Sequence, residues 1–214
     1  ILPSRESDNF ILKLKELKIP FQLFDISKIT KDLKTSIRYI FLSIFEIFEL
    51  KKYFLKENFD LIHVSGGSWQ YKGVIAGFLA RKKIVWHLND TSMPYVFRKL
   101  FMFFSQFPIG FIYASKRSED YYKPLQKMKN PKPSFVIQAP VNTYLFDPNI
   151  NSNGDQSLIN TFEDKIVIGT MANINRIKGI EILILAASKL NKIYDNLVFL
   201  VIGKVHENQR SYFN

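Results

Sequence analysis

Several side chains that can bind a ligand or transfer a proton lie where apolar runs of the sequence end. Three of the apolar runs with the length of a strand are residues 60–64, 83–88 and 165–171, and each is followed by a polar loop and a segment with helical spacing. Ligands of open α/β sheets bind in the crevice beyond the carboxyl ends of the strands. The three loops are therefore the first places to look for a functional site.

The loop after the first run contains Gly66 and Gly67, followed by Ser68. Two glycines before a helix offer backbone N–H groups and a helix N-terminus to an anion. The alternative is an ordinary turn between a strand and a helix, which also favours glycine. Neither GxGxxG nor GxxxxGK(S/T) occurs in the sequence, so the usual dinucleotide and P-loop motifs are absent and an NAD-dependent dehydrogenase is excluded.

The second run ends in an imidazole, an amide and a carboxylate: His87, Asn89 and Asp90. His87 can donate a hydrogen bond to a substrate hydroxyl or act as an acid or base. The alternative is a histidine with a purely structural role. His63 and His206 are far from it in sequence and show no metal-ligand spacing, so the sequence predicts no metal site. His63 lies inside a predicted strand, where we expect it to be packed in the core.

The loop after the third run is rich in amides and ends with Arg176 and Lys178 at the start of a predicted helix. Cations are disfavoured at a helix N-terminus unless an anion lies between them. The pattern therefore predicts a phosphate site at Arg176, Lys178 and Gly179. The alternative is a basic loop that only faces water.

Strand and helix patterns alternate along the first 140 residues. Such alternation implies crossover connections, and crossovers imply a parallel sheet that is covered on both faces. The fold class predicted for this region is therefore α/β, with a doubly wound, Rossmann-like parallel sheet. The expected helices are 7–17 and 32–56, and the expected strands are 21–26, 60–64, 83–88, 110–114 and 134–138.

A polar passage rich in Asn, Asp and Pro, residues 141–164, interrupts this alternation in the way that a linker between domains does. A strand at 165–171, a helix at 179–190 and a strand at 197–202 follow it. They form one βαβ unit, the start of a second α/β domain. Because so small a unit leaves apolar surface uncovered, we expect it to be unstable in isolation.

The charge of the chain is basic, with 30 Lys+Arg against 19 Asp+Glu and a net charge of +11. Most of the basic residues are lysines, and no arginine-rich or zinc-finger pattern occurs, so we expect no nucleic-acid partner. The absence of cysteine excludes disulfides and a cysteine nucleophile. With no leader pattern and no apolar run of about 18 residues, we expect a cytoplasmic protein that does not span a membrane.

Residues 94–107 raise the question of contact with a membrane surface. Their phenylalanines and a leucine form a wide apolar face, with Arg98 and Lys99 on the other side. This pattern fits an interfacial helix on anionic lipid. The alternative is a helix packed on the sheet, since doubly wound sheets need such faces buried.

The order and spacing of these motifs resemble family-four glycosyltransferases of GT-B fold, over nearly the whole chain. The second domain carries the resemblance through Lys178-Gly179-Ile180-Glu181 and the strand that ends at Gly203. The first domain carries it through the segments 60–63, 85–87, 112–115 and 136–148.

The resemblance implies a retaining transfer of a sugar from a nucleotide-diphosphate donor to a glycan or lipid-linked acceptor. It implies no required metal or other cofactor. Lys178 matches the lysine that neutralises the donor diphosphate, and His87 matches the histidine that reaches the donor sugar. Asn173 stands where the family commonly has an arginine, and Arg176 lies nearby. The expected substrate-binding residues are Lys178, Gly179, Arg176, Asn173, Asn89, Asp90, Ser115, Gly66 and Gly67.

The resemblance also implies a division of the chain. Residues 1–140 are the acceptor-side domain without its first strand, 141–164 the linker, and 165–214 the start of the donor-binding domain. The family's glycine-rich loop would precede Ile1 and its paired glutamates would follow Asn214. We therefore expect residues 1–214 to be an inactive fragment of a transferase of polysaccharide biosynthesis. The alternative is a noncatalytic α/β module that binds carbohydrate or nucleotide-sugar.

Overall fold

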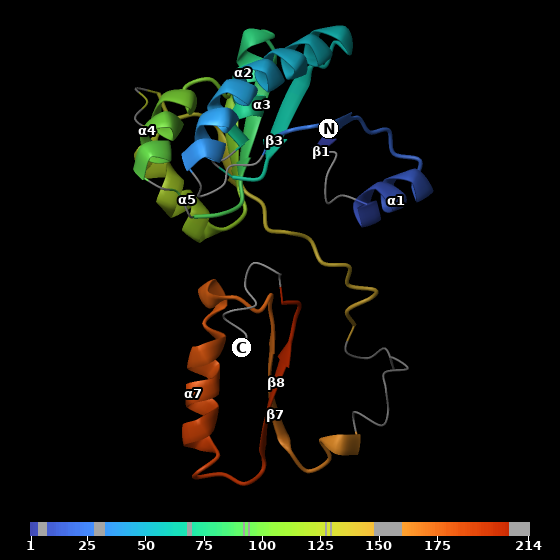
Figure 1. The fold of residues 1–214 in the computed structure, drawn as a ribbon, viewed down its shortest axis with the longest axis vertical. Helices are drawn as coiled ribbons and strands as arrows, with labels where there is room; N and C mark the ends of the chain where they lie inside the picture. The colour runs from blue at the N-terminus through green and yellow to red at the C-terminus, as the bar shows by residue number, and fades with distance from the viewer. Residues whose placement is uncertain are drawn as a thin grey trace. The chain divides into compact units, whose positions relative to one another are not determined.

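The chain divides into two compact units, Ile1–Pro140 and Val141–Asn214, which are described separately (Figure 1). The computed structural model describes residues 1–3, 8–27, 33–67, 70–91, 93, 95–126, 128, 130–147 and 160–205. Ser68 and His206 lie outside these residues, as does most of the polar passage that the sequence analysis assigned to a linker.

The first unit is built on a parallel four-stranded sheet with the order β3-β4-β5-β6. Each strand pairs in parallel with the next one along the chain, and a helix makes each crossover connection. The strands are β3 (Leu61–Ser65), β4 (Lys83–Leu88), β5 (Gly110–Tyr113) and β6 (Ser134–Val136), and the connecting helices are α3 (Tyr71–Leu79), α4 (Tyr95–Phe104) and α5 (Lys116–Tyr122). A 3₁₀ turn, Lys123–Leu125, follows α5. The predicted α/β parallel sheet is confirmed.

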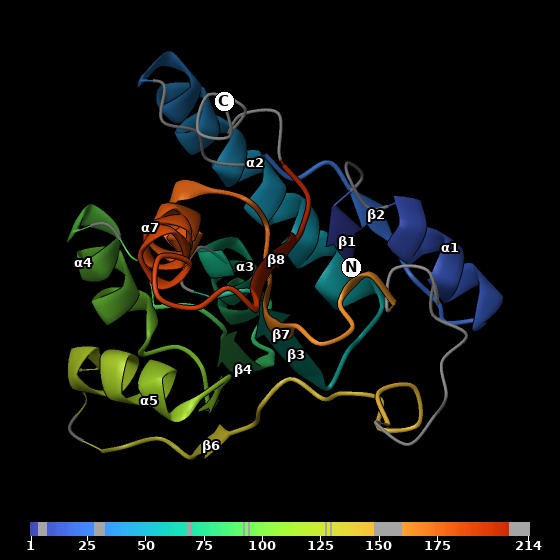
Figure 2. The same cartoon turned by 90° about the horizontal axis from the view of Figure 1, so that it is seen from below.

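One face of this sheet forms the core of the unit. Trp86 of β4 and Phe111 of β5 are paired in register and fully buried, and Tyr113 is buried one step further along. The long helix α2 (Leu33–Lys56) contacts α3, and α3 contacts α4 (Figure 2). The apolar spacing of these helices explains the packing, because each turns one stripe toward the core.

The opposite face of the sheet is less covered than the sequence predicted. Leu61, His63 and Ser65 are exposed along β3, and Val85 is only half-buried in β4. The expectation that His63 packs in the core is therefore wrong. Side chains alternate between the two faces of β3, and among the described residues only the face of Ile62 and Val64 is buried, so His63 lies on the exposed face.

The first residues form a small parallel pair, β1 (Leu2–Pro3) with β2 (Leu23–Phe24), joined by α1 (Asp8–Glu16). The helix agrees with the sequence prediction, but the strand expected at 21–26 is only two residues long. Strand β1 was not predicted, since two residues carry no periodicity. Among the described strands, this pair forms a sheet separate from β3.

The second unit contains one βαβ arrangement. Strands β7 (Ile166–Met171) and β8 (Leu197–Ile202) pair in parallel along their whole length, and helix α7 (Ile180–Leu190) connects them. A 3₁₀ turn, Arg176–Lys178, leads into α7. Ile180 is the only buried apolar residue that the described part of this unit contains, and Met171, Ile182 and Leu185 are exposed.

Candidate functional site

The loop after β3 is a tight turn that requires both of its glycines. Gly66 and Gly67 have φ angles of +124° and +89°, which residues with a side chain rarely adopt. The Gly67 N–H donates to the His87 carbonyl at 3.3 Å, and the Trp86 Nε1–H donates to the Gly67 carbonyl at 3.1 Å. A Cβ on Gly67 would lie 2.8 Å from Oδ1 of Asp90. The turn is thus fixed to β4, with the Gly67 amide already bonded.

His87 lies near the carboxyl end of β4, opposite Ser65 of β3 and Ile112 of β5. Its ring stacks on that of His63, with centroids 5.4 Å apart and planes 15° apart. Its Nε2 is buried and finds no hydrogen-bond partner among the residues that the structure describes. Burial, and secondly the charge of His63, lower the pKa of His87. The imidazole is therefore neutral near pH 7 and keeps a ring nitrogen for a ligand.

Asn89 and Asp90 follow β4 but are placed differently. Asn89 is exposed, and its Nδ2 lies 3.4 Å from Oγ of Ser65. Asp90 is half-buried and accepts the Tyr122 hydroxyl at 2.9 Å. Burial raises the pKa of Asp90, and the Tyr122 hydrogen bond partly offsets this. Asp90 therefore braces the Gly67 turn against α5, while Asn89 remains accessible.

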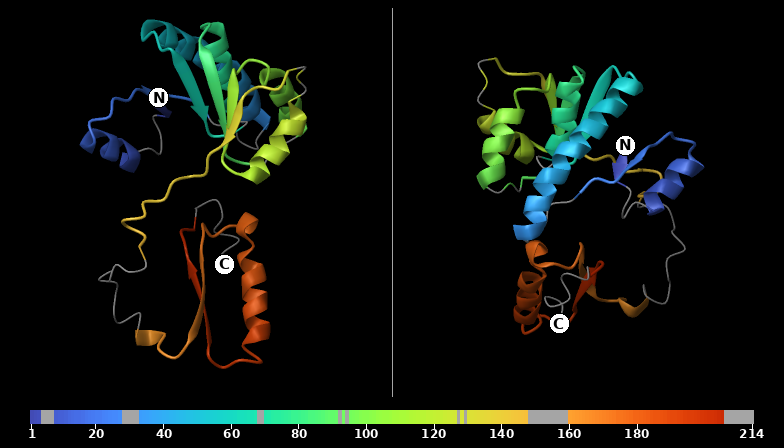
Figure 3. Two further views of the ribbon diagram at one scale, coloured as in Figure 1. Left: turned by 180° about the vertical axis from the view of Figure 1, so that it is seen from behind. Right: turned by 45° about the horizontal axis from the view of Figure 1, so that its top comes forward.

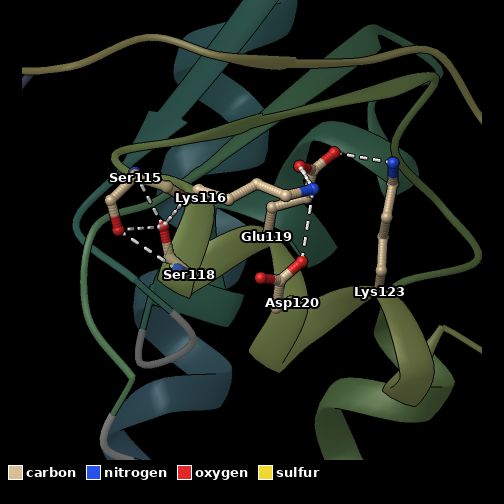
Figure 4. Close-up of polar contacts among 6 residues, drawn as sticks. All are labelled: Ser115, Lys116, Ser118, Glu119, Asp120 and Lys123. Carbon is tan, nitrogen blue, oxygen red and sulfur yellow. Dashed lines mark hydrogen bonds and ion pairs between the residues drawn. The ribbon is translucent and has the colours of Figure 1, made fainter.

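Ser115 caps helix α5 (Figure 4). Its Oγ accepts the Ser118 N–H at 3.1 Å, and its own N–H donates to Oγ of Ser118 at 2.9 Å. One turn later, the Glu119 carboxylate pairs with Lys116 at 2.7 Å and with Lys123 at 2.6 Å. The hydroxyl predicted to bind substrate therefore already has a structural role.

The basic loop of the second unit follows β7. Arg176 and Lys178 are exposed in the 3₁₀ turn, and Gly179 has a φ of +63° before α7 begins. Within the described part of the chain, neither cation forms an ion pair. Asn173 is also exposed. Two exposed cations therefore lie in the short loop that leads directly into α7, a helix of 11 residues.

The structure brings the predicted residues together in two groups. Gly66, Gly67, His87, Asn89 and Asp90 lie at the carboxyl ends of β3 and β4, and Ser115 follows the neighbouring β5. Asn173, Arg176, Lys178 and Gly179 lie between β7 and α7 of the second unit.

A buried ion pair in the first unit escaped the sequence analysis. Nζ of Lys72, in the first turn of α3, forms a hydrogen bond and ion pair with Oε2 of Glu46 in α2. The same Nζ donates to the carbonyl and hydroxyl oxygens of Ser27, at 3.1 and 3.0 Å. The Ser27 N–H donates to Oε1 of Glu46 at 3.0 Å. The signal was in α3, where Lys72 is the only charged residue of an apolar sequence. Together these contacts connect the segment after β2 to α2 and α3.

The close packing around Gly203 in the second unit was also not predicted. A Cβ on Gly203, just after β8, would lie 1.8 Å from the carbonyl oxygen of Ala172, just after β7. The two loops at this end of the sheet therefore approach each other closely. Only a residue without a side chain fits there, and the sequence showed it as the glycine that ends an apolar run.

The described residues contain no group of three or more His, Cys, Asp or Glu side chains that could ligate a metal ion. Among the described helices, none combines the length and the hydropathy that a membrane-spanning segment needs.

Comparison with known proteins gives a match at the level of structure. No protein-family model and no curated protein sequence matches the chain. The solved structure of HepE (Alr3699) from Anabaena in complex with UDP and glucose matches with a TM-score of 0.70 and 20% identity, over 95% of this chain and 53% of that one. The chain has the GT-B fold over the part that it spans.

Further structures agree with this fold. HepE in complex with UDP-glucose matches with a TM-score of 0.72 and 18% identity, over 96% of this chain and 53% of that one. A glycosyltransferase from Rickettsia africae ESF-5 matches with a TM-score of 0.64 and 16% identity, over 90% of this chain and 49% of that one. The chain therefore spans about half the length of the solved structures that it matches.

Proposed function

We propose that this chain is part of a glycosyltransferase that transfers a sugar from a nucleotide-diphosphate donor to a glycan or lipid-linked acceptor, with retention, as in family four. The observation that carries the proposal is the match, over 95–96% of the chain, to a structure solved with UDP and with UDP-glucose. In this proposal the first unit is the acceptor-side domain, residues 141–164 are the linker, and the β7–α7–β8 unit begins the donor-binding domain.

Lys178 and Arg176 would hold the donor diphosphate. Negative charge builds up on the leaving diphosphate as the bond to the sugar breaks, and a fixed cation stabilises it. Both side chains are exposed in the turn that starts α7, and the helix start adds a favourable dipole. This arrangement supplies positive charge without a metal ion or other cofactor.

His87 would contact the donor sugar from the acceptor side. Its lowered pKa keeps the ring neutral near pH 7, so one nitrogen can donate to a sugar hydroxyl while the other accepts. Asn89, exposed beyond the same strand, supplies a second polar group. Gly66, Gly67 and Asp90 then shape the loop, and Ser115 orients α5.

The test compares kcat/KM for sugar transfer in the whole protein that carries this chain. We expect Lys178→Ala to cost about 2–4 kcal/mol of transition-state stabilisation, a loss of roughly 30- to 900-fold. His87→Ala should also lower kcat/KM. Lys189→Ala, an exposed lysine in the last turn of α7, is the matched control and should leave the rate unchanged. A rate unaffected by Lys178→Ala would remove that lysine from the site.

Residues 1–214 by themselves are proposed to be inactive, since they span about half the length of the matched structures. Asn173, where the family commonly has an arginine, favours a second candidate: a noncatalytic module that binds carbohydrate or nucleotide-sugar. Binding of a nucleotide-sugar by the whole protein without its consumption would identify this second function.

The proposed setting is the cytoplasm, with peripheral contact to the anionic inner face of the cell membrane and a role in polysaccharide biosynthesis. The net charge of +11 supports attraction to such a surface. A lipid-linked acceptor would be presented there.

A further inference from the structure

Helix α2 carries two apolar faces, and the structure buries only one of them. Ile47, Leu50 and Phe54 belong to the core of the first unit. On the other side of the helix, five large apolar side chains are 50–69% exposed: Phe41, Ile44, Phe45, Phe48 and Leu55. Spacings of three, four and seven residues place them on one stripe, about 21 Å long at 1.5 Å per residue. The right-hand view of Figure 3 shows α2 lying in front of the sheet of its unit.

Three lysines accompany this stripe. Lys52 continues it one turn beyond Phe48, and Lys51 and Lys56 lie on either side. Nζ of Lys51 is 5.8 Å from the centroid of the Phe48 ring, so this side chain lies along the apolar surface. Glu49 is the only acidic residue between Phe41 and Lys56 besides the buried Glu46.

We propose that the exposed face of α2, formed by Phe41, Ile44, Phe45, Phe48 and Leu55 with Lys51, Lys52 and Lys56, rests on an anionic lipid bilayer. A helix with aromatic and aliphatic residues on one side and lysines at its border lies in the interface, with the apolar residues among the acyl chains and the lysines at the headgroups. Lysine is depleted in protein–protein interfaces, so its presence along the stripe favours lipid over a protein partner.

This placement differs from the helix that the sequence analysis singled out. In α4, Phe101 is buried and Phe104 packs against the core, as does Phe107 just after the helix. Phe107 stacks on Phe78 with ring centroids 4.0 Å apart. Leu100 and Phe103 are the apolar side chains of the predicted face that remain exposed. The apolar face of α4 therefore serves mainly to pack α3 and α4 together, and α2 provides the larger free surface.

The inference refines the membrane contact proposed above, and lipid binding is measured without sugar transfer, so either proposal can fail alone. The first experiment is co-sedimentation with vesicles of phosphatidylcholine containing one quarter phosphatidylglycerol, or of pure phosphatidylcholine. We expect binding to the anionic vesicles, weakened about tenfold by Phe45→Ser or Phe41→Ser. Phe103→Ser in α4, also exposed, is the matched control and should bind like the wild type.

The contribution of charge is tested in the same assay. Lys52→Ala should weaken binding to the anionic vesicles about fivefold. Lys189→Ala in α7 removes the same charge elsewhere and should have no effect. Equal losses for the two substitutions would mean that general basicity, and not this face, binds the vesicle, which would overturn the proposal.

Insertion is measured directly with a fluorophore on residues 1–214, because this chain has no cysteine and a single introduced thiol is labelled uniquely. A polarity-sensitive dye on Phe45→Cys should shift to the blue on anionic vesicles. The same dye on Tyr144→Cys, an 86% exposed position in the second unit, should not shift. The absence of a blue shift at position 45 would overturn the proposal. So would a protein that does not bind vesicles and instead forms a dimer, seen by light scattering, that Phe45→Ser abolishes.

Discussion

The buried pair of Glu46 and Lys72 gives the sharpest test of how the first unit is held together. Lys72→Met would leave the Glu46 carboxylate, 10% exposed, with its bond from the Ser27 N–H but without its cation. Removing one partner of a buried pair costs about 3–5 kcal/mol. Glu46→Leu should cost a similar amount, because burial already lowers the pKa of Lys72 and only Glu46 opposes this.

The double variant Glu46→Leu with Lys72→Met should be far less destabilised than the sum of the two. It leaves no unpaired charge, and the remaining cost is the lost partners of the Ser27 backbone, about 1–3 kcal/mol. The coupling energy of the cycle should therefore be at least about 3 kcal/mol.

Urea unfolding followed by tryptophan fluorescence measures these values, since both tryptophans lie in the first unit and Trp86 is fully buried. The control is Lys13→Met in the exposed pair with Glu16, where we expect less than about 1 kcal/mol. Single losses below about 1 kcal/mol, or a double variant that equals the sum, would refute the reasoning.

Three further predictions concern the loops at the carboxyl ends of the strands. Gly67→Ala should destabilise the first unit by about 2–3 kcal/mol in urea unfolding, because the φ of Gly67 is +89° and a Cβ there would meet the Asp90 carboxylate. The control Gly169→Ala, whose Cβ would meet nothing within 4 Å, should be neutral, and equal effects of the two substitutions would contradict the prediction. By NMR titration, the pKa of His87 should lie below 6.5, and it should rise in His63→Gln without reaching 6.5, since burial is the larger cause. The stability that neutral His87 contributes should be full above pH 6.5 and fall as the pH drops through this lowered pKa. A pKa that His63→Gln leaves unchanged would show that the charge of His63 does not lower the pKa of His87. Ser115→Ala should cost about 1 kcal/mol through loss of the α5 cap, whereas Ser115→Thr, which keeps a hydroxyl, should cost less; equal losses would argue against the cap.

Much of the fold could be predicted from periodicity. The strand predicted at 83–88 matches β4, and the strand predicted at 197–202 matches β8, because long apolar runs in parallel sheets leave little choice of conformation. The short pair β1 and β2 could not be predicted with its observed bounds, since two-residue strands are set by tertiary contacts and not by local pattern.

The candidate site was predictable only in part. The glycine turn and His87 were found because strand ends in α/β sheets face a crevice. The hydroxyl of Ser115 and the carboxylate of Asp90 have structural partners, Ser118 and Tyr122. Ser118 is three residues from Ser115, so this cap is a local pattern that could have been recognised in the sequence. Tyr122 lies 32 residues from Asp90 and Lys72 lies 26 residues from Glu46, so local spacing does not show these two pairs. The roles of the individual site residues stay predictions.

The central claim, transfer from a nucleotide-diphosphate sugar, is tested most directly by proton NMR of the whole protein that carries this chain, mixed with a panel of such donors and glycan or lipid-linked acceptors. The anomeric signals report both whether a donor is consumed and the configuration of the new bond. We predict that at least one donor is consumed and that its anomeric configuration is kept in the product. Donors that all remain intact in the presence of acceptors, or a product of inverted configuration, would contradict it.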